Sequence, residues 1–315
     1  MKITLSTLTA LFTLAFLSTA ISAAHVTRGY SEGYSSSLRI HYGVFKSEIQ
    51  PTHGDVLYFH GYGDTFENHL RLFKSMTDAG LRVIAFDLPS HGRTSGGEWD
   101  DLDWFSFRDL ADVAGVIDHE TLEDSSRPLI LAGWSTGGLL AIRIAQLESL
   151  SPLSRLPKGL LLFAPAVSVP MCVGEGLCQI TNETLTHDLS RYGTEISPTS
   201  PLFRFKFAAN LLYEASESWN PLPPNIPMLT WVADNVEDRY VNTPQLKSWV
   251  ARQRLLRRGP VFAAQCAGSR HELDNETDKF GGQFVRITSA DFLRRVLSRE
   301  AVHSSSLVSS TCSGF

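Results

Sequence analysis

A serine flanked by glycines is the residue with the clearest chemical potential in this chain. The segment Gly133-Trp134-Ser135-Thr136-Gly137 matches the pattern G-x-S-x-G, and it lies between the apolar runs Leu129–Ala132 and Leu139–Ala145. A sharp turn from a strand into a helix would strain the backbone of Ser135 and expose its hydroxyl group. The backbone N–H of Thr136, at the start of the helix, would then face a developing oxyanion. The pattern therefore predicts a nucleophilic serine with Thr136 as one oxyanion donor.

A second glycine-rich turn could supply the other oxyanion donor. The apolar run Asp55–Phe59 ends in His60-Gly61-Tyr62-Gly63-Asp64. The loop after such a strand provides a backbone N–H to the oxyanion in hydrolases built on a parallel sheet, and Tyr62 is the residue best placed for it. Glycines on both sides allow the backbone to approach a substrate closely. We expect His60 to hold this loop rather than to carry a proton.

Strands and helices alternate around these two turns, which predicts an α/β fold with a mostly parallel sheet covered on both faces. The predicted strands and helices are bounded by apolar periodicity and by turn residues. Besides the run before Ser135, the predicted strands are Leu38–Phe45, Asp55–Phe59, Arg82–Phe86, Gly159–Phe163, Met228–Val232 and Val261–Gln265. Besides the helix after Ser135, the predicted helices are Phe66–Ala79, Asp103–Glu120, Pro244–Arg258 and Ser289–Leu297.

One long segment interrupts the alternation. From about residue 170 to residue 227 no comparable strand is found and prolines are frequent, which is typical of a functional insertion such as a lid. We expect a mostly helical cap. Phe203, Phe207 and Leu211 share one helical face, which predicts either a seal against the sheet or the wall of an acyl-chain tunnel. Arg204 and Lys206 would then lie towards the mouth of that tunnel.

Three motifs in order give the chain a family resemblance. HGYGD, then DLPSHGRTSG from Asp87 to Gly96, then GWSTGG resemble the α/β-hydrolase superfamily, in particular its branch of lysophospholipases, monoacylglycerol lipases and related serine aminopeptidases. The resemblance covers nearly the whole chain after residue 24, including a cap in the expected place. In that branch the second motif is structural, so it implies no catalytic role for Asp87 or His91.

The resemblance also implies a catalytic triad in the order serine, acid, histidine along the chain. His271 follows the last predicted parallel strand in a glycine-containing loop and is the expected base. The acid should follow the strand Met228–Val232, where Asp238-Arg-Tyr-Val fits the family pattern better than Asp234. Because this loop is about two residues longer than usual, Asp234 stays open as the alternative, with Glu237 as a more remote one.

The ends of the chain and its cysteines suggest export. Residues 1–24 have the positive start, apolar centre and small residues of a signal peptide, which leaves residues 25–315 as one α/β-hydrolase domain in a secreted, extracellular or periplasmic protein. In an oxidising compartment, Cys172 and Cys178 are expected to form a local disulfide. Cys266 and Cys312 would form a second bridge or stay free. Asn182 and Asn275 begin glycosylation sequons.

These observations predict a serine carboxylic ester hydrolase that acts on monoacyl lipids and needs no cofactor or metal. A net charge of -5 argues against a nucleic-acid partner. A lipid substrate would bring transient contact with a membrane or micelle surface, whereas the sequence leaves the oligomeric state open. A small-ester hydrolase or an aminopeptidase of the same fold is the alternative enzyme. A non-enzymatic binding module is a third hypothesis, although such a module should lack part of the triad.

Overall fold

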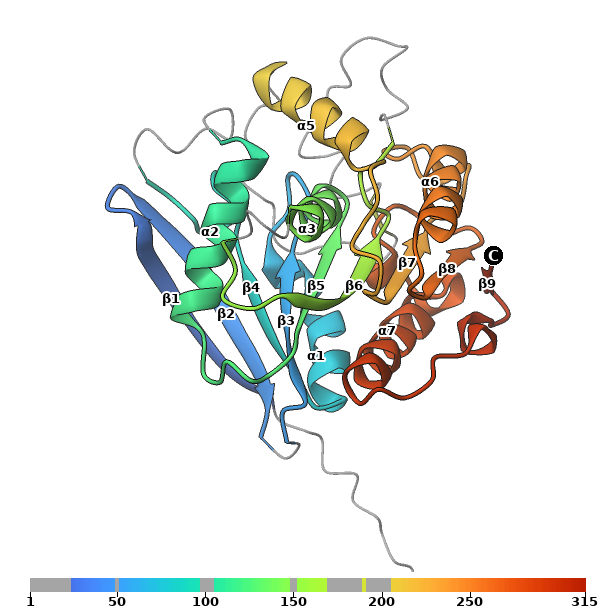
Figure 1. Ribbon diagram of the computed structural model, residues 1–315, viewed down its shortest axis with the longest axis horizontal. Helices are drawn as coiled ribbons and strands as arrows, with labels where there is room; N and C mark the ends of the chain where they lie inside the picture. Colours follow the sequence, from blue (N-terminus) through green and yellow to red (C-terminus); the bar gives the residue numbers. More distant parts are fainter. Residues whose placement is uncertain (1–23, 49–50, 97–104, 148–151, 169–188, 191–204) are drawn as a thin grey trace, which may run out of the picture.

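A nine-stranded sheet forms the centre of the molecule in the computed structural model, which describes residues 24–48, 51–96, 105–147, 152–168, 189–190 and 205–315 (Figure 1). The strand order is β1-β2-β4-β3-β5-β6-β7-β8-β9. The pairings from β4 through β8 are parallel, whereas β1, β2 and β9 are antiparallel to their neighbours. The strands are β1 (Ala24–Ser35), β2 (Leu38–Ser47), β3 (Gly54–Phe59), β4 (Leu81–Phe86), β5 (Leu129–Trp134), β6 (Pro157–Phe163), β7 (Met228–Val232), β8 (Val261–Cys266) and β9 (Cys312–Gly314).

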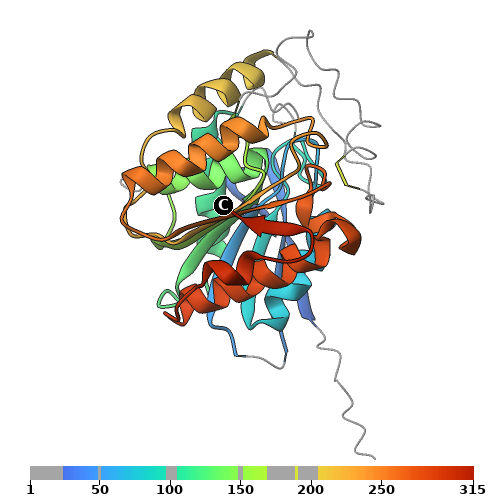
Figure 2. The same ribbon diagram turned by 90° about the vertical axis from the view of Figure 1, so that its right-hand side faces the viewer.

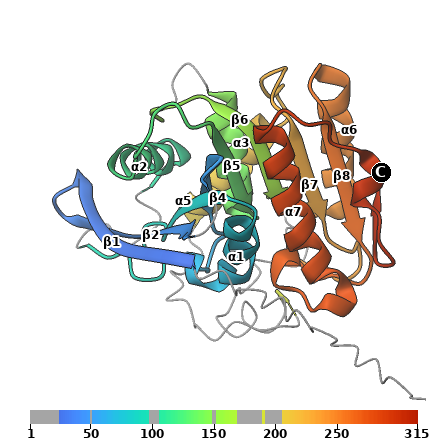
Figure 3. The ribbon, with the colours of Figure 1, turned by 90° about the horizontal axis from the view of Figure 1, so that it is seen from below.

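Helices cover both faces of this sheet, as Figure 3 shows from below. One face packs against α2 (Phe107–Glu120), α3 (Thr136–Gln146) and α6 (Thr243–Leu256), and the other packs against α1 (Leu70–Asp78) and α7 (Gly282–Leu297). Each face therefore has its own apolar core. Because β3, β4 and β5 are buried on both faces, their sequences are almost continuously apolar rather than alternating. The predicted α/β fold, with a mostly parallel sheet covered on both faces, is confirmed.

All seven strands expected from the sequence are present, and the structure adds two. Strand β1 escapes prediction because it is an edge strand whose residues are mostly exposed and polar. Strand β9 has only three residues and pairs with β8 at the opposite edge. Neither strand carries the apolar pattern on which a sequence-based prediction depends.

The predicted helices differ from the observed ones mainly at their starts. The helix expected over 66–79 is divided into a 3-10 turn at Phe66–His69 and α1. Helix α2 begins at Phe107 because Ser106 caps it: the Ser106 hydroxyl accepts from the N–H of Asp109, whose carboxylate accepts from the N–H of Ser106. Helix α7 is seven residues longer at its start than the expected Ser289–Leu297.

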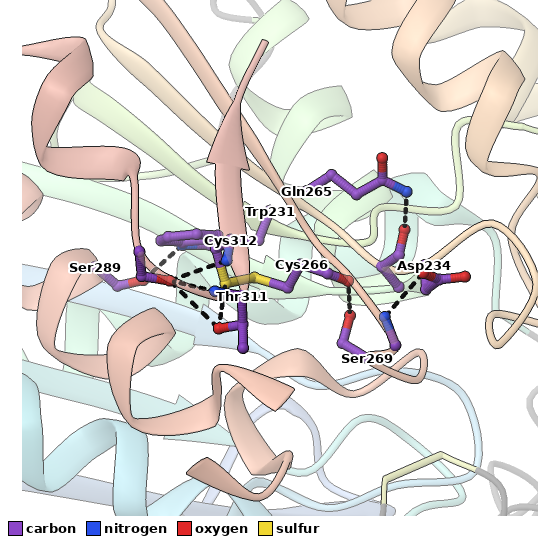
Figure 4. The surroundings of a disulfide bond; sticks show 11 residues. Trp231, Asp234, Gln265, Cys266, Ser269, Ser289, Thr311 and Cys312 are labelled. Atoms are coloured by element: carbon purple, nitrogen blue, oxygen red, sulfur yellow. Dashed lines mark hydrogen bonds between the residues drawn. A yellow bond between two sulfur atoms is a disulfide. The ribbon is translucent and has the colours of Figure 1, made fainter. Parts of the chain in front are cut away.

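A disulfide bridge joins the last parallel strand to the C-terminal segment. Cys266, the final residue of β8, is bonded to Cys312, the first residue of β9, across 46 residues of sequence (Figure 4). The N–H of Ala267 also donates to the carbonyl of Thr311 at 2.9 Å. The bridge therefore fixes the chain where the loop of His271 begins. Cys172 and Cys178 lie outside the described residues.

The described part of the expected cap contains one helix, α5 (Phe205–Glu217). In Figures 1 and 2 it lies beyond α3, outside the sheet. Buried residues of α5 join the same apolar core as α2 and α3. No helix among the described residues is long and apolar enough to cross a membrane.

Candidate active site

Ser135 lies at a sharp turn between β5 and α3. Its backbone has φ 54° and ψ -119°, a conformation that a non-glycine residue rarely adopts, and its N–H donates to the carbonyl of Phe163 at 2.9 Å. The flanking glycines make the turn sterically feasible. A Cβ on Gly133 would lie 2.4 Å from the carbonyl oxygen of Gly137, and a Cβ on Gly137 would lie 2.2 Å from that of Phe59.

The turn presents the Ser135 hydroxyl to a histidine from a distant loop. His271 Nε2 lies 2.9 Å from Ser135 Oγ, and His271 Nδ1 lies 3.0 Å from Asp238 Oδ2. Both His271 and Asp238 are buried. The imidazole therefore stands between a hydroxyl group and a carboxylate, which is the arrangement that lets a histidine accept the serine proton.

The structure brings Asp238, rather than Asp234, to His271. The other oxygen of Asp238 accepts from the N–H groups of Tyr240 and Val241 at 2.9 and 3.0 Å. The carboxylate of Asp234 instead accepts from Val236 and Gly268, and so ties the loop after β7 to the loop after β8. Burial opposes the charged form of Asp234, but these N–H groups outweigh it and lower the pKa of the carboxyl group.

Glu237, the remote third candidate for the acid, makes a different contact. Its carboxylate lies 3.8 Å from the guanidinium of Arg270, and both side chains are partly exposed. Trp134 holds the backbone of His271, because its indole N–H donates to the His271 carbonyl at 3.0 Å. The residue before the candidate nucleophile thus fixes the backbone of the candidate base.

The loop after β3 packs directly over Ser135. A Cβ on Gly61 would lie 3.2 Å from Ser135 Cβ and 2.5 Å from the Trp134 ring, so only glycine allows this approach. Tyr62 follows Gly61, and its side chain is buried. Thr136, on the other side of the nucleophile, is the first residue of α3, where backbone N–H groups lack partners within the helix. The expected oxyanion donors thus belong to the residue that follows Gly61 and to the residue that follows Ser135.

Two neutral histidines hold this loop in place. His60 Nδ1 donates to the carbonyl of Gly61 at 2.7 Å, and His60 Nε2 accepts from the N–H of Leu88 at 2.9 Å. His91 Nε2 likewise accepts from the N–H of Gly63 at 2.9 Å. Burial lowers the pKa of His60, and burial beside a second imidazole, that of His60, lowers the pKa of His91 to about 4. His60 therefore has the structural role expected for it.

Asp87 is a second support of the same region. Its carboxylate contacts His41 Nδ1 at 2.8 Å and accepts from the N–H groups of Phe66 and Arg93. A Cβ on Gly92 would lie 2.3 Å from this carboxylate, which accounts for the glycine in the second motif. Asp87 and His91 thus both act on the backbone of loops.

Comparison with known proteins decides the family. The model of the Alpha/beta hydrolase family matches residues 56–299, well over half of the chain. The chain belongs to the α/β-hydrolase family. No curated protein sequence matches it significantly.

Solved structures of hydrolases share the fold at low sequence identity. A monoacylglycerol lipase from Paleococcus ferrophilus is 18% identical with a TM-score of 0.61, covering 82% of this chain and 99% of its own. A soluble variant of monoglyceride lipase from Saccharomyces cerevisiae, bound to a substrate analogue, is 16% identical with a TM-score of 0.65, covering 89% and 96%. A thermostable carboxyl esterase from Bacillus coagulans, in complex with glycerol, is 14% identical with a TM-score of 0.64, covering 86% and 99%.

The cap helix of this hydrolase reaches the loop above Ser135. The Phe207 ring of α5 stacks on Tyr62 at 5.4 Å between centroids, and Phe207 is only 2% exposed. Leu211, one turn later, is also buried, whereas Lys206 and Leu212 are exposed. The expected apolar face is therefore present from Phe207 onward and packs at the site. Phe203 and Arg204 lie outside the described residues.

A buried acidic cluster that no sequence motif indicates lies beside this site. His69 contacts Asp64 and Asp274, with Glu272 next to them, and all four side chains are at most 2% exposed. One ligand atom each from Asp64, His69 and Glu272 lies within 4.8 Å of the others, so these residues have the types and proximity of a metal site. The sequence contains no such group of residues at metal-ligand spacing, and the expectation that no metal is needed stays a prediction. Asp64 and His69 are about 200 residues from Glu272 and Asp274, and motif spacing reveals only ligands that are close in sequence.

Asn275 argues against one of the two sequons. Its side chain is 1% exposed, and its amide nitrogen donates to the Asn68 carbonyl at 2.8 Å and to Glu272 Oε1 at 2.6 Å. A glycan on Asn275 would break both bonds and has no space in this fold. Asn182, the other sequon, lies outside the described residues.

Proposed function

We propose that this protein is a secreted serine hydrolase that cleaves carboxylic esters of monoacyl lipids, as a lysophospholipase or a monoacylglycerol lipase does. The observation that carries the proposal is the position of His271 Nε2, 2.9 Å from Ser135 Oγ, with Asp238 3.0 Å from its other nitrogen. Three residues that are far apart in sequence form one hydrogen-bonded chain at a strained serine. Such an arrangement serves nucleophilic acyl transfer.

The mechanism follows from this geometry. His271 takes the proton of Ser135 as the hydroxyl oxygen attacks the ester carbonyl, while Asp238 orients the ring and stabilises its charged form. The N–H groups of Tyr62 and Thr136 hold the negative oxygen of the tetrahedral intermediate. His271 then protonates the departing alcohol. Water attacks the acyl-enzyme by the same route and releases the fatty acid.

Apolar cover above the nucleophile supports a lipid substrate. Phe207 and Leu211 of α5 are buried towards the site, and Phe207 stacks on the expected oxyanion residue Tyr62. Sites for acyl chains are built from such side chains with few polar groups. Two of the solved relatives are a monoacylglycerol lipase and a monoglyceride lipase. Lipid turnover would bring the protein to membrane or micelle surfaces, and residues 1–24 would direct its export.

A fluorophosphonate probe tests the enzyme class. The purified protein should react covalently with the probe, and Ser135→Ala should abolish the labelling without changing the circular dichroism spectrum. Loss of kcat should reach several orders of magnitude, because the triad acts as a unit. If Ser135→Ala keeps more than about a tenth of the activity, the nucleophile is wrong.

A substrate series tests the lipid class. Lysophospholipids, monoacylglycerols and nitrophenyl esters of increasing chain length should show a preference for long acyl chains, because each buried methylene contributes about 0.8 kcal/mol. Phe207→Ser should reduce turnover of long chains more than of short ones. Leu212→Ser, on the exposed side of the same helix, is the matched control. A preference for acetyl or butyryl esters that Phe207→Ser leaves unchanged would favour a small-ester hydrolase, and turnover of peptide amides would favour an aminopeptidase.

A further inference from the structure

His69 links two loops of the candidate site that are far apart in sequence. Its Nε2 lies 2.6 Å from Asp64 Oδ2 and its Nδ1 lies 2.7 Å from Asp274 Oδ2, with all three side chains buried. Asp64 ends the loop that carries Tyr62, and Asp274 lies three residues after His271. One imidazole ring therefore bridges the expected oxyanion loop and the loop of the expected base.

We propose that His69 is a positioning residue, which fixes the oxyanion loop against the His271 loop through hydrogen bonds to Asp64 and Asp274. The inference rests on the proposed function, because it assumes that Ser135 and His271 perform the chemistry. Oxyanion donors and base must be held within a fraction of an ångström of their working geometry, and a displacement of about 1 Å can cost about a hundredfold in rate.

Two further contacts show that this link is part of a built structure. The Asn275 amide donates to the carbonyl of Asn68 at 2.8 Å, so the 3-10 turn that carries His69 is also tied directly to the His271 loop. The Trp134 ring contacts both imidazoles, with centroids 5.8 Å from the His69 ring and 5.2 Å from the His271 ring. The bridge therefore supports the oxyanion loop, the residue before the nucleophile, and the base together.

The hydrogen-bond geometry requires a doubly protonated ring. Both nitrogens face carboxylate oxygens, which accept and do not donate when ionised. Burial opposes the charged form of His69, but Asp274 and Asp64 outweigh it and raise the pKa of the ring well above its ordinary value. Burial and the charge of Asp64 also raise the pKa of Glu272, which favours its neutral form. Titratable or charged groups from three parts of the chain surround the His69 ring. Strand β3 and the loop after it contribute Tyr58, His60 and Asp64, and the His271 loop contributes Glu272 and Asp274. Helix α7 contributes Arg286, which donates to the Asp274 carbonyl.

A metal ion would be the competing occupant of this cluster. Asp64, His69 and Glu272 offer suitable atoms, and the hydroxyl of Tyr58 and one oxygen each of Glu272 and Asp274 have no hydrogen-bond partner among the described residues. Coordination by His69 Nε2 would require the loss of its proton, whereas a distance of 2.6 Å to Asp64 is that of a charge-assisted hydrogen bond. We therefore favour the protonated bridge, and the two alternatives make opposite predictions.

Isosteric variants test the positioning role by kinetics. His69→Gln and Asp274→Asn should each lower kcat about 10- to 100-fold with KM nearly unchanged, because the groups act on the geometry of the reacting atoms and not on the substrate. Asp118→Asn is the matched control: Asp118 is equally buried and accepts from Arg155 at 2.6 Å, far from the site. It should lower the melting temperature but leave kcat unchanged. Equal kcat in wild type, His69→Gln and Asp274→Asn would overturn the inference.

A measurement on the wild-type protein keeps the inference testable even if these variants fold poorly. Nitrogen-15 spectra of the histidine rings at pH 8 should show one ring, assigned to His69 by its contact with Tyr58, that carries protons on both nitrogens. A neutral His69 would overturn the inference. One equivalent of bound zinc or manganese, found by metal analysis of protein purified in metal-free buffer, would also overturn it.

Amide exchange separates a failure of this inference from a failure of the proposed function. In His69→Gln, exchange should become faster in residues 61–65 and 268–275 together, and Asp118→Asn should leave both segments unchanged. This result does not depend on turnover. If the wild type lacks reaction at Ser135, the proposed function fails, whereas unchanged exchange in His69→Gln rejects the bridge itself.

Discussion

Two buried charged clusters lie at opposite ends of strand β3, and they are built from different chemistry. At the start of the strand, Asp55 accepts from Arg155 at 2.7 Å, from Arg82 at 3.2 Å and from Arg127 at 3.3 Å, and Arg155 also pairs with Asp118. We call these residues the arginine cluster. Beyond the end of the strand, His69 lies among Asp64, Glu272 and Asp274, which together form the histidine cluster.

The two clusters differ in whether their charges titrate near neutral pH. Guanidinium groups stay charged at every physiological pH, so the arginine cluster is a fixed set of ion pairs that joins β3, β4 and the segments before β5 and β6. The histidine cluster has one cation for three carboxyl groups and depends on where protons lie. The parallel strands direct their carboxyl ends to one edge, where ligands bind in such sheets. Fixed charge thus occurs at the structural end and titratable charge at the chemical end.

The largest effect on turnover is expected at the chemical end of the sheet, in the acid of the candidate site. Asp238→Asn should lower kcat on the order of 10⁴-fold, because the amide no longer sets the tautomer of His271. Asp234→Asn is the matched change in the same loop and should cost far less, since its carboxylate holds only backbone N–H groups. Steady-state kinetics on the two variants checks this. Comparable loss in both, or loss only in Asp234→Asn, would mean that Asp238 is not the acid.

At the other end of β3 the effect should fall on stability instead. Asp55→Asn leaves the buried arginines without their shared counter-charge, and we expect a loss of about 3–5 kcal/mol in the free energy of unfolding. Turnover per folded molecule should be unchanged at temperatures well below the transition. Urea unfolding and titration of active sites with a fluorophosphonate separate the two quantities. A fall in kcat of the folded fraction would show that the two ends are coupled.

The disulfide provides a reference that involves neither cluster. Replacing Cys266 and Cys312 together by Ala should lower stability by about 2–4 kcal/mol, because a 46-residue separation is no longer constrained in the unfolded chain. Activity at 25 °C should change little, since the hydrogen bond between Ala267 and Thr311 still holds the start of the His271 loop. Thermal unfolding and ester turnover measure the two effects. A large loss of kcat would place the bridge among the supports of His271.

The smallest expected effect is a dependence of stability on pH that arises from the histidine cluster alone. The pKa of His69 is raised in the folded protein, so its contribution is fully present below the unfolded value near 6.5 and is lost as pH rises towards the folded value. Stability should therefore fall between pH 7 and 9, by up to about 1.4 kcal/mol for each pH unit.

His69→Gln should remove the part of that slope that His69 contributes, and Glu272 should keep its own part. Asp118→Asn should keep the whole slope, because the arginine cluster does not titrate in this range. Chemical denaturation at three pH values measures the slopes. The same slope in wild type and His69→Gln would show that His69 is not charged in the native state.

Local chemistry made a large part of this molecule predictable from its sequence. Glycines around Ser135 and Tyr62 had to mark tight turns, because no other residue fits beside the Phe59 carbonyl or the Trp134 ring. Continuous apolar runs had to be central strands, since both faces of such strands are covered. The family resemblance then indicated His271 as the base, and both the alternation of elements and the fold class are confirmed.

Other features depended on contacts that no local pattern contains. The sequence left Asp234 and Asp238 as alternatives, and the path of one loop decided which carboxylate reaches His271. Strand β9 forms because β8 offers a free edge and Cys266 offers a bond, although three residues have no strand signal of their own.

The histidine cluster is the clearest case of this kind. His69 and Asp274 are 205 positions apart, and each looks unremarkable where it stands. Only the closure of the parallel sheet brings the loops after β3 and β8 to the same edge, where burial turns ordinary side chains into a charged bridge. The sequence by itself determined which residues could do chemistry, and the tertiary structure decided which of them meet.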